Sequence, residues 1–210
     1  VFLLQVMSAR GLFLCLALAN AVAAVWSIVL LPQELTANLA RQLFRFLFRV
    51  EVRGLEYYKQ AGRKAVIVAN HTSLLDGPLL SAFLPDRSTF AINSHMAKRW
   101  WVKPAFALFD LAPIDPTNPL AIRTLVDAVK SGSRVVIFPE GRLTVTGALM
   151  KVYEGPGAIA QMADAKVLPV RIDGAQFSKF SRMHGKLRLR WFPKITVTFL
   201  PPVKFNAPEH

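Results

Sequence analysis

The sequence predicts an α/β domain whose mixed, largely parallel sheet is flanked by helices. Three short runs of β-branched and apolar residues indicate strands buried on both faces, and they cover residues 64–70, 133–138 and 166–173. The clearest helix lies between the first two runs, because Asn118 can cap it, Pro119 suits its first position and Gly132 lies past its end. Strands that alternate with helices in this way are typical of such a sheet.

The remaining elements of the domain complete the alternation. We expect helices over 75–84 and over 96–109, the second with a kink at Pro104, and strands over 88–93 and 194–203. No internal repeat or second domain boundary is apparent, so residues 54–210 are expected to form one domain.

The composition excludes several classes of protein. With 53% hydrophobic residues among 210, the chain has enough apolar side chains for a sizeable core and is not a disordered protein. One cysteine excludes a disulfide scaffold, and four histidines give no reason to expect a metal site. A net charge of +13 indicates an anionic partner, such as nucleic acid, an acidic protein or a phospholipid surface.

The first 32 residues are strongly apolar. Between Gly11 and Leu31 there is no charged residue, and about 20 apolar residues are long enough to cross the hydrocarbon core of a bilayer. The run is too long for the core of a signal peptide and has no cleavage site. We therefore expect residues 1–32 to be a transmembrane segment that ends a longer membrane region, with a buried helix of a soluble protein as the alternative.

A basic amphipathic helix is expected to follow over residues 33–53. Arg41, Arg45 and Arg49 are spaced four apart, and the opposing stripe is apolar: Leu39, Leu43, Phe46, Leu47 and Val50. Such a helix next to a membrane span lies on an anionic lipid surface, although an ordinary surface helix is the alternative. The excess of arginines on this side of the span predicts that the main domain is cytoplasmic.

The chemistry is expected at two polar turns, each directly after a buried strand. In α/β sheets functional groups gather beyond the carboxyl ends of strands. His71 and Asp76 lie in the first turn, and on one regular helix they would point about 140° apart. They can therefore pair only across a turn, where the carboxylate would leave one ring nitrogen free to accept a proton. The alternative is a capped loop with a structural histidine.

The second turn contains Glu140, Gly141 and Arg142 directly after Phe138-Pro139. The glycine allows a tight turn, and the guanidinium offers a planar set of donors that suits a phosphate. The alternative is a solvated turn with an incidental ion pair. There is no Walker loop and no G-x-S-x-G elbow, so Ser73 is not expected to be a nucleophile.

Together the two turns resemble the signatures of the PlsC-like glycerolipid acyltransferase family. The His-x4-Asp block corresponds to His71 and Asp76, the Phe-Pro-Glu-Gly block to 138–141, and the apolar-Pro-Val block to 167–170. The likeness covers about residues 45–203. Several segments more narrowly resemble the acyltransferase part of the bacterial bifunctional 2-acylglycerophosphoethanolamine acyltransferase/acyl-ACP synthetase.

The resemblance implies direct acyl transfer at a membrane. His71 would take the proton of a glycerol hydroxyl, and Asp76 would orient His71. Glu140, Gly141 and Arg142 would form the substrate site, where Arg142 grips a phosphate. Thr72 or Ser73, or nearby backbone N–H groups, would stabilise the oxyanion.

No metal or cofactor is implied, and the donor would be a thioester of acyl carrier protein or coenzyme A. The acceptor would be a lysophospholipid, and 2-acyl-lysophosphatidylethanolamine is expected, with 1-acylglycerol-3-phosphate as the alternative. The enzyme would reside in the bacterial inner membrane.

Two positions depart from the family pattern. Arg142 directly follows Gly141, where the family usually has an intervening threonine, and Pro116 stands where the family has an arginine that helps to hold the acceptor phosphate. The second departure favours the phosphodiester acceptor.

The end of the chain is basic. Between Asp173 and Glu209 there is no acidic residue, and aromatic residues are interspersed among the basic ones. This pattern suits anionic headgroups or an acidic carrier protein. A non-catalytic module that binds anionic lipid or nucleic acid would explain the charge but not the two polar turns, so no nucleic-acid partner is expected.

Overall fold

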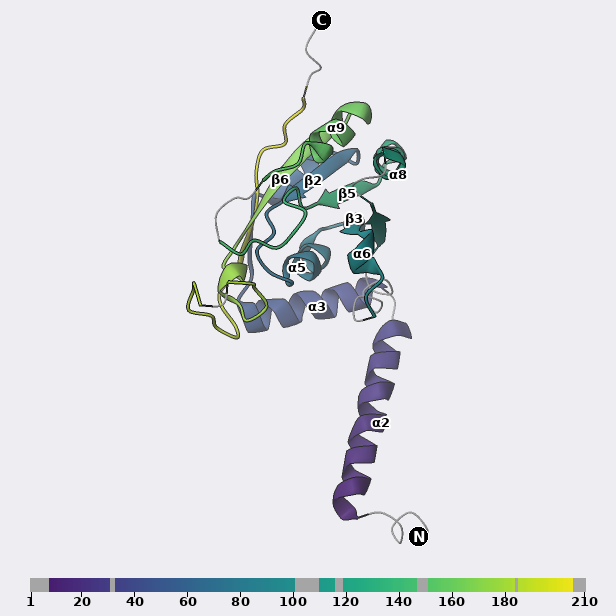
Figure 1. The fold of residues 1–210 in the computed structure, drawn as a ribbon, viewed down its shortest axis with the longest axis vertical. Helices are drawn as coiled ribbons and strands as arrows, with labels where there is room; N and C mark the ends of the chain where they lie inside the picture. Colours follow the sequence, from purple (N-terminus) through teal and green to yellow (C-terminus); the bar gives the residue numbers. More distant parts are fainter. Residues whose placement is uncertain are drawn as a thin grey trace, which may run out of the picture. The chain divides into compact units, whose positions relative to one another are not determined.

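The computed structural model describes residues 8–30, 33–100, 110–115, 119–146, 151–183 and 185–205 (Figure 1). The chain divides into two compact units, Val1–Thr36 and Ala37–His210. The first unit contains the helix α2 (Ala9–Leu30) and the beginning of α3 (Gln33–Phe48).

The transmembrane segment expected over residues 1–32 is not supported. A helix does form there, but no helix in the described part of the chain is both long enough and apolar enough to cross a membrane. The helix α2 contains the charged residue Arg10 and the polar residue Asn20.

The second unit is built on a mixed, largely parallel sheet, as predicted. Seven strands follow the order β1-β7-β6-β2-β5-β3-β4 among the described residues, and of the neighbouring pairs only β6 and β7 are antiparallel. The strands are β1 (Glu51–Arg53), β2 (Ala65–Ala69), β3 (Ser88–Asn93), β4 (Leu111–Ile114), β5 (Arg134–Ile137), β6 (Lys166–Asp173) and β7 (Thr196–Phe199).

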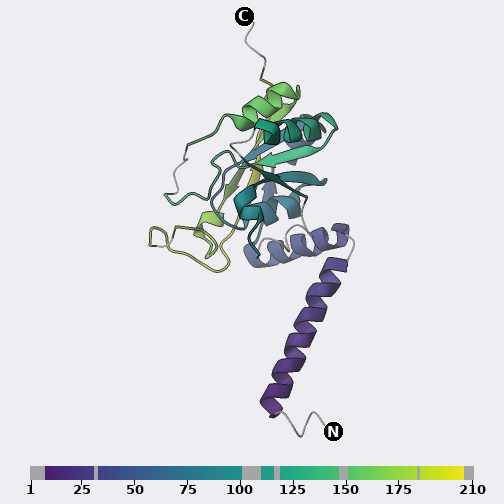
Figure 2. The same ribbon diagram turned by 45° about the vertical axis from the view of Figure 1, so that its right-hand side comes forward.

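Helices cover both faces of this sheet (Figures 1 and 2). One face is covered by α8 (Pro119–Lys130) and α9 (Gly155–Met162), and the other by α3, α4 (Leu55–Ala61) and α5 (Asp76–Phe83). The helix α6 (Ser94–Ala97) follows β3. This three-layer arrangement is the usual way to bury a parallel sheet.

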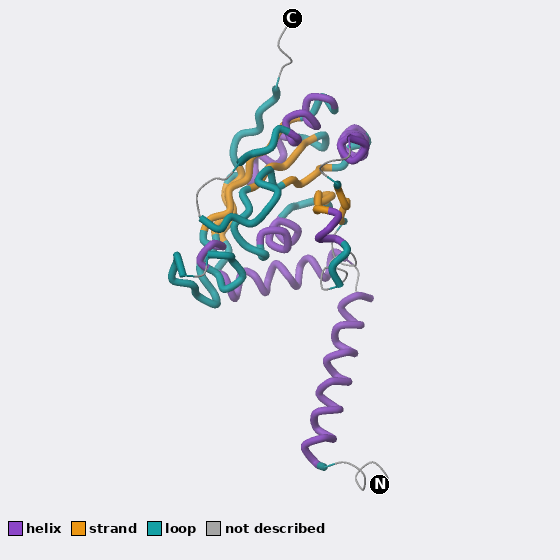
Figure 3. The backbone as a smooth tube through the Cα atoms, viewed as in Figure 1, coloured by secondary structure: helices purple, strands orange, loops and turns teal. Residues whose placement is uncertain are grey.

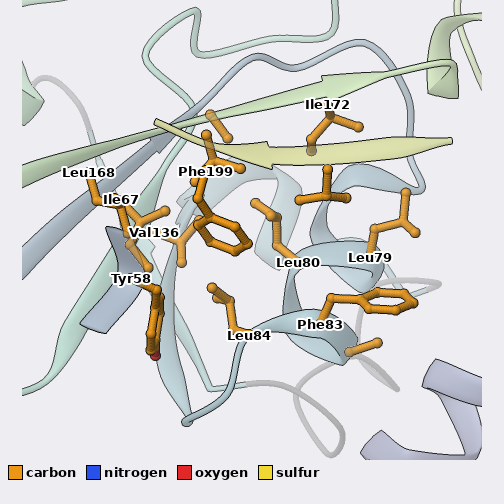
Figure 4. Close-up of a cluster of buried hydrophobic side chains, with 14 of the residues drawn as sticks. Tyr58, Ile67, Leu79, Leu80, Phe83, Leu84, Val136, Leu168, Ile172 and Phe199 are labelled. Atoms are coloured by element: carbon orange, nitrogen blue, oxygen red, sulfur yellow. The ribbon is translucent and has the colours of Figure 1, made fainter. Parts of the chain in front are cut away.

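The core follows from the alternation of side chains along each strand. In β2 the side chain of Ile67 packs with α5, whereas that of its neighbour Val66 packs with α8 and α9. Figure 4 shows the α5 side of the sheet, where Leu79, Leu80 and Phe83 of α5 lie in one cluster with Phe199 and side chains of the central strands. Each fully buried side chain of this size stabilises the fold by about 1.5–3 kcal/mol.

Two predicted helices differ from the structure. The helix expected over 96–109 begins earlier and its described part ends at Ala97, while residues 101–109 lie outside the described residues. The apolar stripe predicted for the basic helix is divided in α3. Leu47 packs against the core, whereas Leu39, Leu43 and Phe46 are exposed.

Parallel pairing determines where the turns meet. Val68 of β2 lies opposite Ile137 of β5, and Ala69 lies opposite Val170 of β6. The carboxyl ends of β2, β5 and β6 therefore lie together, and the loops that follow these strands begin at the same end of the sheet, on the left in Figures 1 and 3.

Candidate active site

The turn after β2 begins with a side chain that continues the sheet. Asn70 donates from Nδ2 to the carbonyl of Ile172 over 2.9 Å, and its Oδ1 accepts the Ile172 N–H over 2.7 Å. The amide thus takes the place of a backbone pair at the end of the β2–β6 ladder. No role for Asn70 was expected from the sequence, although its position directly after a buried strand was an available signal.

Next along the turn, His71 and Asp76 form a hydrogen-bonded pair. The distance between His71 Nδ1 and Asp76 Oδ2 is 3.1 Å, and the carboxylate is fully buried. Asp76 is the first residue of α5, where the helix dipole favours a negative charge. Because a carboxylate only accepts hydrogen bonds, Nδ1 carries the hydrogen of a neutral ring, and Nε2 is left as a proton acceptor.

The same carboxylate oxygen also holds the backbone of the turn. Asp76 Oδ2 accepts the N–H of Thr72 over 2.6 Å and that of Ser73 over 2.8 Å. Both N–H groups are therefore occupied by the carboxylate, so neither is available to the oxyanion that backbone N–H groups were expected to stabilise. Within the described residues, Asp76 Oδ1 and the hydroxyl of Thr72 are buried without a hydrogen-bond partner.

The side chain of Ser73 has a structural role as well. It is fully buried, its Oγ lies 3.0 Å from Ser178 Oγ, and it accepts the N–H of Leu75 over 3.2 Å. The hydroxyl of Ser73 is therefore not available to contact a substrate. Ser178, which comes from the loop after β6, was not identified from the sequence.

The turn after β5 holds His71 from a second direction. The ring of Phe138 stacks on the imidazole at 4.2 Å between centroids, with 20° between the planes. Glu140 is 4% exposed, and its Oε1 accepts the backbone N–H of His71 over 3.1 Å. The carbonyl of His71 accepts the N–H of Thr144 over 2.9 Å. Both main-chain polar groups of His71 are therefore bonded to this turn.

Gly141 and Arg142 complete the second turn. Gly141 adopts the left-handed conformation, with φ at 64°, and donates its N–H to the carbonyl of Phe138 over 3.0 Å. Arg142 follows directly and is exposed, and in the described part of the chain its guanidinium has no hydrogen-bond or ion-pair partner. An unpaired guanidinium two residues beyond Glu140 is suited to an anionic ligand.

The contact between Glu140 and His71 leads to a prediction about stability. Glu140→Ala is expected to lower the free energy of unfolding by about 1–3 kcal/mol, because the His71 N–H loses its acceptor. Glu140→Gln keeps an acceptor oxygen at this position, so its free energy of unfolding should fall less. Urea unfolding measures both, and Glu56→Ala, at an exposed position, is the control with an expected change below about 0.5 kcal/mol. Equal losses for the alanine and glutamine variants would contradict the role of the acceptor oxygen.

Taken together, the geometry is that of a general base without a nucleophile beside it. An imidazole oriented by a buried carboxylate can take a proton from a substrate hydroxyl. A neighbouring cation can hold an anionic part of the same substrate. Among the described residues, no group of three His, Cys, Asp or Glu side chains is arranged to hold a metal ion.

The chain belongs to the acyltransferase family, because the family model described as Acyltransferase matches residues 49–173. The chain is 31% identical over 134 residues to the 1-acyl-sn-glycerol-3-phosphate acyltransferase of Pseudomonas aeruginosa, which covers 61% of this chain and 51% of that protein. It is 28% identical over 127 residues to the protein of the same name in Bacillus subtilis, covering 59% and 63%. The chain thus spans about half to two thirds of these curated relatives.

A solved structure shares the fold. The crystal structure of the 1-acyl-sn-glycerophosphate acyltransferase PlsC from Thermotoga maritima matches 90% of this chain and 80% of its own, with a TM-score of 0.64 and 22% identity. At this identity the likeness concerns the fold alone, and it agrees with the predicted α/β architecture. The narrower resemblance to the bifunctional acylglycerophosphoethanolamine enzyme is not shown by these comparisons.

Proposed function

We propose that this protein transfers a fatty acyl group from a thioester to the free glycerol hydroxyl of 1-acylglycerol-3-phosphate. The observation that carries the proposal is the His71–Asp76 pair, held by the turn that also presents Glu140 and Arg142. The names of the relatives support this acceptor over the lysophosphatidylethanolamine that the sequence had favoured.

In the proposed reaction His71 Nε2 accepts the proton of the glycerol hydroxyl while the hydroxyl oxygen attacks the carbonyl carbon of the thioester. The carbon–sulfur bond then breaks, and the departing thiolate takes a proton from the imidazolium, so that the histidine returns to its neutral form. Asp76 stabilises the imidazolium between these two steps. Proton removal of this kind contributes about 10²–10⁴-fold to the rate.

Arg142 is proposed to bind the phosphate of the acceptor. Arg142→Ala is expected to raise KM for the acceptor by about 10- to 100-fold, since a hydrogen bond to a charged group contributes about 1.5–3 kcal/mol. Steady-state kinetics with varied acceptor measures this effect. Arg63→Ala removes an exposed arginine that precedes β2, at the opposite end of that strand, and should leave KM unchanged. An unchanged KM in Arg142→Ala would contradict the assignment.

A second acceptor, 2-acyl-lysophosphatidylethanolamine, is favoured by one specific feature of the sequence. Pro116 follows Ile114-Asp115 at the position where the family has an arginine. Membranes that contain the protein, supplied with both lysolipids and a labelled acyl thioester, decide between the two. We expect the label mainly in phosphatidic acid, and a predominance of labelled phosphatidylethanolamine would show that the second acceptor is correct.

The same assay identifies the donor, because acyl carrier protein and coenzyme A thioesters can be supplied in turn. We further propose that α3 lies on an anionic lipid surface on the cytoplasmic side of the bacterial inner membrane. Leu39, Leu43 and Phe46 form an exposed apolar row on this helix. Arg41 instead faces the domain, where its Nε donates to the carbonyl of Ala82 over 2.8 Å.

A further inference from the structure

The loop between β6 and β7 presents an unusual surface. We call residues 175–183 and 185–195 the C-terminal loop. Four of its aromatic side chains are exposed, namely Phe177, Phe180, Trp191 and Phe192. Its exposed basic residues are Lys179, Arg182, Lys186, Arg188, Arg190 and Lys194. In the sequence no acidic residue occurs between Asp173 and Glu209, so this surface is strongly cationic.

The C-terminal loop is held in place by contacts within the domain. Arg190 donates its N–H to the carbonyl of Phe177 over 2.7 Å, and Lys179 donates its N–H to the carbonyl of Arg190 over 3.1 Å. The ring of Phe192 meets that of Phe48 edge-on at 5.6 Å. The exposed rings are thus positioned by backbone pairing and by packing against the end of α3, and their exposure is a property of the folded domain.

Most of the positive charge is not neutralised within the protein. Lys194 pairs with Glu51 over 2.9 Å, and Lys179 lies over the ring of Trp191 at 5.7 Å. In the described part of the chain, ion-pair partners are lacking for the side chains of Arg182, Arg188 and Arg190. These three guanidinium groups are available to an external anion.

This loop also contacts the turn that carries His71 and Asp76. Leu74 donates its N–H to the carbonyl of Phe180 over 3.1 Å, and Ser73 Oγ lies 3.0 Å from Ser178 Oγ. Leu74 lies between the two paired residues in sequence, and its side chain is 47% exposed. An apolar and cationic surface therefore continues from the C-terminal loop to the turn of the candidate active site.

We propose that the C-terminal loop and Leu74 form a docking surface for a bilayer that contains anionic phospholipid. Basic residues attract anionic headgroups, and exposed aromatic rings are suited to the boundary between headgroups and acyl chains. An acidic carrier protein would match the charges, but it would not account for four exposed rings beside an exposed leucine. The inference rests on the proposed lipid acceptor, which this surface would admit to His71 directly from the membrane.

The single cysteine of the chain allows a direct test. The variant Cys15→Ser/Trp191→Cys, carrying an environment-sensitive fluorophore at position 191, is mixed with vesicles of phosphatidylcholine, with or without phosphatidylglycerol. We expect a blue shift and increased emission with the anionic vesicles only. The matched control carries the label at Lys130→Cys, an exposed position at the end of α8, and should not respond. A label at Arg188→Cys provides a second position should Trp191→Cys fail to fold.

Charge reversal tests the electrostatic part of the proposal. Adding Lys179→Glu and Arg190→Glu to the chain labelled at 191 should raise the lipid concentration for half of the emission change by about tenfold or more. The proposal is overturned if the label at 191 is silent with anionic vesicles, if the Lys130 control responds equally, or if purified acyl carrier protein alone produces the response. Because no step of this test requires acyl transfer, insertion without activity would contradict only the proposed function, and activity without insertion only this inference.

Discussion

Replacing His71 with alanine is expected to lower kcat for acyl transfer by about 10²–10⁴-fold, because the proposed reaction loses its general base. The fold should persist, since the imidazole is partly exposed and its main-chain bonds to Glu140 and Thr144 do not depend on the side chain. Transfer of a labelled acyl group to the lysolipid measures the rate, and circular dichroism with thermal unfolding measures the fold.

The chain offers a matched control for this experiment. His95 is an exposed histidine next to β3, and His95→Ala should retain the activity of the parent protein. His71→Asn preserves more of the packing against Phe138 and serves as the second variant if the alanine form is unstable. A folded His71→Ala or His71→Asn variant with undiminished kcat would refute the proposed mechanism.

The second large effect is expected from Asp76, for which two substitutions separate catalysis from stability. In Asp76→Asn the amide oxygen can accept the three hydrogen bonds of Oδ2, while its NH2 group occupies the site of the unpartnered Oδ1. The fold should therefore persist. The negative charge that stabilises the imidazolium is lost, however, and kcat is expected to fall at least about 10²-fold.

Asp76→Ala should lose stability as well as activity. The N–H groups of Thr72 and Ser73 would both lose their acceptor in a buried site. At about 1–3 kcal/mol for each unsatisfied group, the free energy of unfolding should fall by about 2–6 kcal/mol. Urea unfolding of both variants beside the kinetic assay tests the separation. An asparagine variant that is fully active would show that the carboxylate charge is not required.

The architecture was predictable because its central strands carry a strong signal. The strands β2 and β5 are almost entirely buried, and β6 contains the apolar run Val167–Val170, so all three strands give a clear apolar signal. The strand β4 was missed because it lies at the sheet edge and contains Pro113, which is tolerated only at such a position. The helix α9 was missed because it begins with Gly155-Pro156-Gly157, although proline suits the first turn of a helix.

The pairing of His71 with Asp76 could be anticipated from spacing, because five residues of chain bring them together across one turn. The groups that support this pair could not be identified in the same way. Asn70 bonds to Ile172, and Ser73 bonds to Ser178, each across more than one hundred residues of sequence. These contacts depend on β6 lying next to β2, and the order of strands in a sheet cannot be predicted from a local sequence pattern.

The hydrogen bonds that join His71 to the turn after β5 also restrict the length of that turn. Glu140 accepts the N–H of His71 and Thr144 donates to its carbonyl, and only three residues separate Glu140 from Thr144. Inserting or deleting a residue between Glu140 and Thr144 would displace the imidazole of His71 relative to the carboxylate of Asp76. In this protein, an engineered insertion should therefore be tolerated at a distant connection, such as the turn between α8 and β5, and should disturb the site when it is placed between Glu140 and Thr144.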